Sequence, residues 1–166
     1  MGMVMQFRRA DVATVERLRT GGSDAFVAFI APEDEYDTLV PEQLVDIDKA
    51  WHAIHFLLTG TIGHPVMPAG ALMAGEPVSD ELGYGPARLL NPVEVRQFHA
   101  VLASKPDDFV EKTLDFDALH EAKVYPAIWD RRDPEHIGYV SYHFGTLRVF
   151  FAGAAQAGDA VVQVLM

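Results

Sequence analysis

The spacing of apolar residues along the chain predicts mostly helices, and the clearest one covers residues 45–60. Apolar residues recur there at intervals of three and four, as on one face of a helix: Ile47, Ala50, Trp51, Ile54, Leu57 and Leu58. Phe56 makes a second side apolar, Asp46 suits the N-cap, and Gly60 suits the left-handed residue after the last turn. We therefore expect a helix that crosses the middle of the protein and is buried on more than one side.

Further helices are predicted over residues 11–19, 25–31 and 91–105, after residues 107 and 115, and over residues 138–157. Asp11, Asn91 and Asp115 are capping residues at three of these starts. Asn91 is followed by Pro92 and Glu94, the residues expected at the first and third helical positions. Local chemistry thus predicts where several helices begin.

Two short strands are predicted at the two ends of the sequence, over residues 3–7 and 160–166. Short strands need partners, so we expect both in the same sheet. Residues 61–90, rich in glycine and proline, are predicted to be irregular, with a tight turn that presents Tyr84 and Arg88, and residues 124–129 to be extended. The predicted fold class is α+β: a single helix-rich domain over residues 1–166, with a small sheet involving both chain termini.

Composition narrows the functional classes. Hydrophobic residues make up 49% of the chain, and there is no cysteine. This excludes disulfides, thiolate metal sites and cysteine nucleophiles. The apolar runs are too short to span a bilayer, and the first residues lack the pattern of a secretory signal. We therefore expect a soluble cytoplasmic protein that is not associated with a membrane.

The negative charge is unevenly distributed. The net charge is −11, and residues 23–48 contain eight acidic residues and no Lys or Arg. Such a field repels phosphate backbones, so we expect no nucleic acid partner. The first functional hypothesis is an acidic protein-interaction module, similar to an inhibitor or immunity protein, that binds a basic protein. Its predicted contact surface is Glu33, Asp34, Glu35 and Asp37. The alternative is that the acidic surface only maintains solubility.

The second hypothesis is a small-ligand-binding protein or an enzyme. Asp48, His52 and His55 form a polar stripe on the predicted central helix, where a carboxylate could orient an imidazole for acid–base chemistry. Alternatively, Asp48 stabilises the helix N-terminus and His55 binds a buried carbonyl. The predicted pocket contains Asp48, Trp51, His55, Tyr84 and Arg88. Neither Gly-x-Ser-x-Gly nor His-Glu-x-x-His occurs, and we predict no cofactor and no metal site.

Several segments resemble the YfbM-like family of bacterial proteins, a domain of unknown function. They are Asp46-Ile47-Asp48-Lys49-x-Trp51, His55-Phe56-x-Leu58-Thr59-Gly60, Gly83-Tyr84-Gly85-Pro86-Ala87-Arg88, Tyr125-Pro126 and Gly158-Asp159-Ala160-Val161. The resemblance covers essentially the whole chain and implies a single α+β domain in a bacterial cytoplasm, with no established activity. Position 52 is often not histidine in this family, which counts against a His52–His55 metal pair. The matching residues Asp48, Trp51, His55 and Arg88 could form a shared site.

Overall fold

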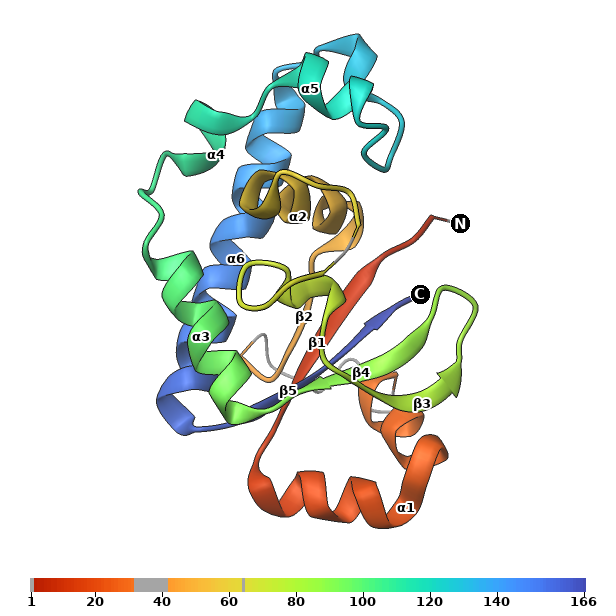
Figure 1. Cartoon of the computed structure of the whole chain (residues 1–166). Coiled ribbons are helices and arrows are strands. Elements are labelled where there is room, and N and C mark those ends of the chain that lie inside the picture. Colours follow the sequence, from red (N-terminus) through yellow and green to blue (C-terminus); the bar gives the residue numbers. More distant parts are fainter. Residues whose placement is uncertain (1, 32–41, 64) are drawn as a thin grey trace.

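One five-stranded antiparallel sheet forms the centre of the protein, in the order β2-β1-β5-β4-β3 (Figure 1). The structure is a computed structural model, and it describes residues 2–31, 42–63 and 65–166. The strands are β1 (Met5–Ala10), β2 (Leu44–Asp46), β3 (Glu76–Glu81), β4 (Pro86–Leu90) and β5 (Ala160–Leu165). The predicted sharing of a sheet by both ends of the chain is confirmed, because β1 and β5 are direct neighbours.

The two faces of the sheet are covered very differently (Figure 1). Among the described residues, one helix, α1 (Val12–Ile30), packs on one face over a small cluster that includes Leu18, Phe26 and Val162. The other face carries the main core and the remaining helices: α2 (Trp51–Thr59), α3 (Pro92–Ala103), α4 (Phe109–Thr113), α5 (Phe116–Glu121) and α6 (Glu135–Ala157). Short 3-10 turns are η2 (Asp48–Ala50), η3 (Ala71–Met73) and η4 (Trp129–Arg131). The α+β prediction is confirmed.

Capping residues begin the helices where the sequence predicted them. The Asp11 carboxylate accepts the Thr14 N–H at 2.7 Å, and Asn91 and Glu94 form a reciprocal capping box at the start of α3. Asp115 caps α5. The two helices predicted over residues 11–19 and 25–31 join in α1, which kinks at Gly22 (φ 71°). α6 begins slightly earlier than predicted, at Glu135.

The central helix is shorter than predicted, which corrects the expectation for residues 45–60. Residues 44–46 pair with β1 as strand β2, and the helix proper, α2, begins only at Trp51. Asp46 does not cap α2; its carboxylate accepts the Asp48 N–H at 2.6 Å and turns the chain out of the strand. Gly60 ends α2 with a left-handed conformation, as predicted. Residues 51–55 are all buried, so the helix is embedded on several sides.

Two other expectations were wrong. Residues 61–90 are not irregular throughout, because they contain η3 and the β3–β4 hairpin, whose turn uses positive φ angles at Gly83 and Gly85. Residues 124–129 form no strand; they bend at the cis Tyr125–Pro126 peptide and lead into η4.

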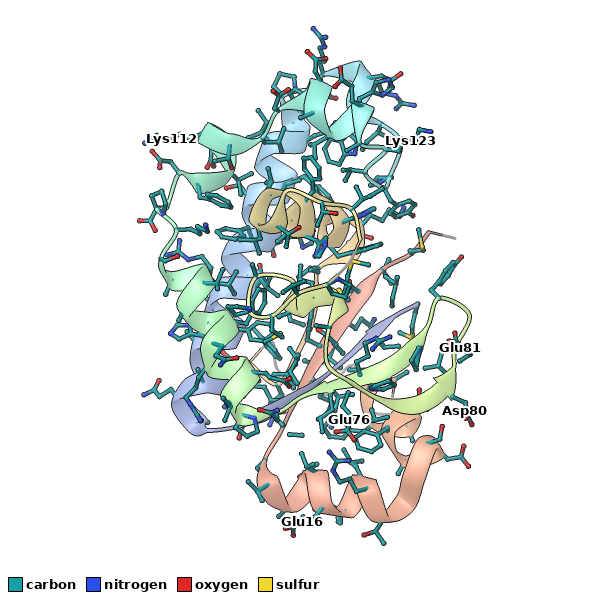
Figure 2. All side chains as sticks on the ribbon, viewed as in Figure 1. Glu16, Glu76, Asp80, Glu81, Lys112 and Lys123 are labelled. Atoms are coloured by element: carbon teal, nitrogen blue, oxygen red, sulfur yellow. The ribbon has the colours of Figure 1, made fainter. Side chains whose placement is uncertain are left out.

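The outer strand β3 carries exposed acidic residues instead of an apolar alternation. Asp80 and Glu81 project from this strand at one side of the molecule, and Glu76 lies between the sheet and α1 (Figure 2). Charged residues on an edge strand prevent it from pairing with another chain. Glu76 also forms an exposed ion pair with Arg19 of α1 at 2.6 Å. Because these residues are charged, β3 has no alternation of apolar residues that could be recognised in the sequence.

In the part of the chain that the structure describes, no helix has the length and apolarity needed to cross a bilayer.

Candidate functional site

Three of the five residues predicted to form a ligand pocket line one small cavity. Trp51, Tyr84 and Arg88 surround a space of about 140 Å³ on the main-core face of the sheet, together with residues of η3 and β5. Asp48 lines a different hollow of about 790 Å³, which it shares with Tyr84. His55 lines neither. The structure therefore brings Trp51, Tyr84 and Arg88 together and places Asp48 and His55 elsewhere.

Arg88 brings a positive charge to this cavity. It lies on β4, is partly buried, and donates one hydrogen bond from Nη1 to the Gly75 carbonyl at 3.1 Å. Among the described residues it forms no ion pair, and no carboxylate is found in the lining of the cavity. A guanidinium has five N–H donors in a planar fork that matches a carboxylate or phosphate. Arg88 can therefore offer further donors to an anion.

Gln163 lies beside Arg88 and was missed by the sequence analysis. The two residues are paired directly across β4 and β5. The Gln163 side chain is 1% exposed, and its Nε2 donates to the carbonyls of Ala71 and Ala74, both at 2.8 Å. Its Oε1 has no hydrogen-bond partner among the described residues. The detectable signal was a single polar residue within the apolar run 160–166.

The other walls of the cavity are aromatic and aliphatic. Trp51 is 4% exposed, and its indole N–H donates to the Met3 carbonyl at 3.2 Å, which fixes the ring. Tyr84, by contrast, is 54% exposed at the tip of the β3–β4 hairpin. Met5 and Leu72 supply apolar surface. The cavity thus combines a rigid interior wall with an exposed aromatic side chain at its outer part.

Asp48 is occupied by a different interaction. Its carboxylate accepts the Tyr139 hydroxyl at 2.9 Å, and the same hydroxyl accepts the Lys49 N–H at 3.1 Å. Burial and the Asp48 carboxylate raise the pKa of Tyr139 above its ordinary value, so the phenol stays protonated. These bonds hold η2 against α6 and give Asp48 a structural role.

His52 makes the buried contact that was predicted for His55. The Tyr125 N–H donates to Nδ1 of His52 at 2.9 Å, so Nε2 carries the proton and donates to the Ile62 carbonyl at 3.0 Å. The ring stacks on Trp51 with a centroid distance of 4.6 Å. Burial lowers the pKa of His52, although the Ile62 carbonyl opposes this shift. His52 is therefore a neutral residue that ties three segments together.

His55 has a more apolar environment. It is fully buried, and neither ring nitrogen has a hydrogen-bond partner within the described residues. Burial, and then the nearby His52, lower the pKa of His55; the Gly63 backbone offsets part of this shift without meeting hydrogen-bond geometry. Asp48 contributes to the pKa of neither imidazole. The hypothesis that Asp48 orients an imidazole for acid–base chemistry therefore gains no support.

The other predictions concern the acidic contact surface and metal binding. Glu33, Asp34, Glu35 and Asp37 lie in residues 32–41, outside the described residues. Asp46, from the same acidic stretch, accepts a hydrogen bond from Gln6 at 3.1 Å. Within residues 2–31, 42–63 and 65–166, no three His, Asp or Glu side chains are grouped closely enough to hold a metal ion.

These features define an α+β protein with one sheet built from both ends of the chain and a small cavity beside its central strand that contains Arg88 and Gln163 in its lining. A family model described as "Domain of unknown function (DUF1877)" matches residues 1–164, and the chain belongs to this family. The YfbM-like resemblance is thereby confirmed. The fold is similar to that of YfbM from Escherichia coli, a protein of unknown function, whose crystal structure matches with a TM-score of 0.71 and 20% identity. The match covers 98% of this chain and 99% of that one. No curated protein matches the chain.

Proposed function

We propose that this protein binds a small anionic ligand in the cavity lined by Trp51, Tyr84, Arg88 and Gln163. The observation that carries the proposal is Arg88, a partly buried arginine among the residues that line the cavity, in which no carboxylate is found among the described residues. Desolvating a charge is costly unless an opposite charge compensates it. An anion bound in the cavity would supply that compensation.

The cavity limits what can bind. Its volume is about 140 Å³, several times the space that a single water molecule needs. A small carboxylate fits this space. Bidentate hydrogen bonds between guanidinium and carboxylate are shorter and stronger than bonds between neutral groups. Binding would therefore depend on Arg88 more than on any other side chain of the lining.

The proposal is tested by titrating the protein with acetate, propionate and inorganic phosphate and following backbone and indole N–H resonances by NMR. At least one anion should shift the resonances of β4, β5 and the Trp51 indole. Arg88→Gln should weaken that binding at least tenfold. Arg96→Gln, which removes an exposed arginine from α3, is the matched control and should leave it unchanged. Absence of any shift, or equal affinity in Arg88→Gln, would rule the proposal out.

A second candidate is the acidic protein-interaction module predicted from the sequence, in which a basic protein is the partner. It is favoured by the eight carboxylates and the absence of Lys and Arg over residues 23–48. Asp46 and Asp48 already have hydrogen-bond partners within the protein. The contact surface would therefore centre on Glu33, Asp34, Glu35 and Asp37. Both candidates assume a cytoplasmic protein, as expected from the sequence.

This second candidate is tested by reversing Glu33, Asp34, Glu35 and Asp37 to lysine. Surface charge changes have small effects on stability, so the melting temperature should hardly change. Capture of a specific basic partner at low salt should be lost. It should also weaken in the parent protein as salt rises, because the Debye length falls from ~10 Å at 0.1 M to ~3 Å at 1 M. Partner capture that survives the reversal would contradict the hypothesis.

A further inference from the structure

We propose that His52 is an acid-sensitive contact: protonation of its imidazole releases the segment around Tyr125 and, with it, the first described residues of the chain. The ring lies on α2 between two segments, and each of its nitrogens is hydrogen-bonded to one of them. The two bonds respond in opposite ways to protonation of the ring.

At Nδ1, the imidazole has to accept a hydrogen bond. The Tyr125 backbone N–H can only donate, so at 2.9 Å it needs the lone pair of this nitrogen. A protonated imidazole carries an N–H at both nitrogens, so two donors would face each other. Protonation of His52 therefore removes the bond that joins α2 to Tyr125.

At Nε2, protonation strengthens the bond. This nitrogen donates to the Ile62 carbonyl at 3.0 Å in the neutral ring, and a hydrogen bond from a charged donor is stronger than one from a neutral donor. His52 therefore keeps its contact with residues 61–63 and gives up its contact with Tyr125.

The segment that contains Tyr125 is anchored on both sides. Val124 is fully buried; its N–H donates to the Leu119 carbonyl at 3.0 Å, and its carbonyl accepts the Trp129 indole N–H at 2.8 Å. Trp129 is buried as well. Residues 125–128 thus lie between two fixed points, so they can open locally while the rest of the domain stays folded.

Tyr125 links this segment to the beginning of the chain. Its hydroxyl accepts the Met3 N–H at 2.9 Å, and Gly2 packs so closely that a Cβ there would lie 2.3 Å from the hydroxyl oxygen. Without Tyr125, Met3 keeps the Trp51 indole as a hydrogen-bond partner through its carbonyl. Movement of Tyr125 therefore loosens Gly2 and Met3 together.

The titratable groups around the ring leave it neutral until the solution is acidic. His55 lies on the same helix, Tyr125 faces the ring from the other segment, and residues 61–63 carry no ionisable side chain. His143 of α6 is not influenced by His52. Burial lowers the pKa of His52, and no carboxylate among the described residues opposes this shift. The contact is therefore released only below the ordinary histidine pKa of ~6.5.

The test follows hydrogen exchange of single backbone amides by NMR in the wild-type protein at about pH 7.5 and about pH 5. Protection factors are compared, because they correct for the dependence of intrinsic exchange on pH. Those of Tyr125 and Met3 should fall at least about tenfold in acid, whereas that of Val162 in β5 should change less than about twofold. Imidazole ¹⁵N resonances report the protonation of His52, and the loss of protection should follow it.

His52→Asn is the matched variant. The amide oxygen of asparagine lies as many bonds from the backbone as Nδ1, so it can accept the Tyr125 N–H, and it does not titrate in this range. Protection of Tyr125 and Met3 in this variant should be equal at both pH values. His120→Asn, which removes an exposed histidine of α5, is the control and should keep the wild-type response. Melting curves confirm that both variants are folded.

Several results would overturn the proposal. Protection that falls equally throughout the protein would mean global unfolding, and an imidazole that stays neutral until then would not be a switch. Protonation of His52 without loss of protection at Tyr125 would show that the bond does not hold the segment. A loss that persists in folded His52→Asn would assign the effect to another group. If that variant does not fold, the wild-type comparison of imidazole protonation with Tyr125 exchange decides.

Discussion

His52 on the central helix and Gln163 on the central strand are both buried polar side chains, but only His52 has a hydrogen-bond partner for every polar atom. In the helix, both ring nitrogens of His52 have partners, the Tyr125 N–H and the Ile62 carbonyl. On the strand, Gln163 uses its NH₂ group and leaves Oε1 without a partner among the described residues. A fully bonded polar residue stabilises one conformation, whereas an unfilled acceptor retains the capacity to bind something else. The comparison therefore assigns a stabilising role to His52, whereas His55 on the same helix leaves both ring nitrogens without a partner among the described residues, as Gln163 leaves Oε1.

The largest expected effect is loss of β5, on which both regions depend. Deleting residues 160–166 removes the strand between β1 and β4, so the sheet on which the main core packs is interrupted. The truncated chain should lose cooperative unfolding, as measured by circular dichroism during heating. Removing only Met166 should leave the transition in place. A soluble truncation that melts cooperatively would show that the helices form a core without the sheet.

The next effect concerns Trp51, which belongs to both regions. It is 4% exposed, stacks on His52 and lines the cavity. Trp51→Ala should lower the free energy of unfolding by about 3–5 kcal/mol, because truncating a buried aromatic residue leaves a void. Urea denaturation measures this value. Tyr142→Ala, which alters a side chain that is 70% exposed, is the control and should change stability by less than about 0.5 kcal/mol.

A direct comparison of the two polar residues uses His52→Leu and Gln163→Leu. His52→Leu leaves the Tyr125 N–H and the Ile62 carbonyl without their partner, and should cost about 2–3 kcal/mol. Gln163→Leu should cost only about 1 kcal/mol, because it also removes an unpaired oxygen, and the Ala71 carbonyl still accepts the Ala74 N–H. Denaturation of both variants in urea decides the order. The reverse order would mean that Gln163 is mainly a structural residue.

The smallest effect is a dependence of stability on pH, to which His52 and His55 of the central helix and His143 of α6 all contribute, because burial lowers the pKa of each. Burial lowers the pKa of His52 and His55 in the folded protein, so the unfolded chain binds protons more readily below the ordinary histidine pKa of ~6.5. Stability should therefore be full above that pH and fall as the pH drops below it. The pKa values of Asp11 and Glu76 are also lowered in the folded protein. Protonation of these two carboxylates therefore destabilises the protein only at lower pH. Urea denaturation at each pH measures the fall, which His52→Leu should reduce.

The sequence predicted those parts of the fold whose causes are local. Asp11, Asn91 and Asp115 cap helices through bonds to residues within four positions, and the sequence displays both partners. β3 was missed because its acidic residues face solvent at a sheet edge, so the strand has no apolar alternation to detect. Asp48 and His55 were grouped on one helix that in fact begins only at Trp51. The Asp48 carboxylate instead binds Tyr139, which is far away in the sequence.

The lining of the cavity was predicted only in part, because only some of its residues stand out from their neighbours in the sequence. Trp51, Tyr84 and Arg88 stood out as aromatic and charged residues beside a glycine-rich turn, and they line one space. Gln163 did not stand out, because its hydrogen bonds go to the carbonyls of Ala71 in η3 and of Ala74 just after it, about ninety residues earlier. Hydrogen bonds between such distant segments are determined by tertiary packing, which no local pattern encodes.

The position of β5 in the chain has a consequence for synthesis. β1, β2, β3 and β4 all leave the ribosome before the strand that joins them. Until β5 emerges, the β1–β2 pair and the β3–β4 hairpin each expose an unpaired edge, at β1 and β4, and the apolar face beneath the helices is incomplete. Unpaired edges and exposed apolar surface make nascent chains prone to aggregation. Folding of this sheet is therefore completed only after β5 has been made, so a nascent chain that ends before β5 should aggregate more readily than one that includes it.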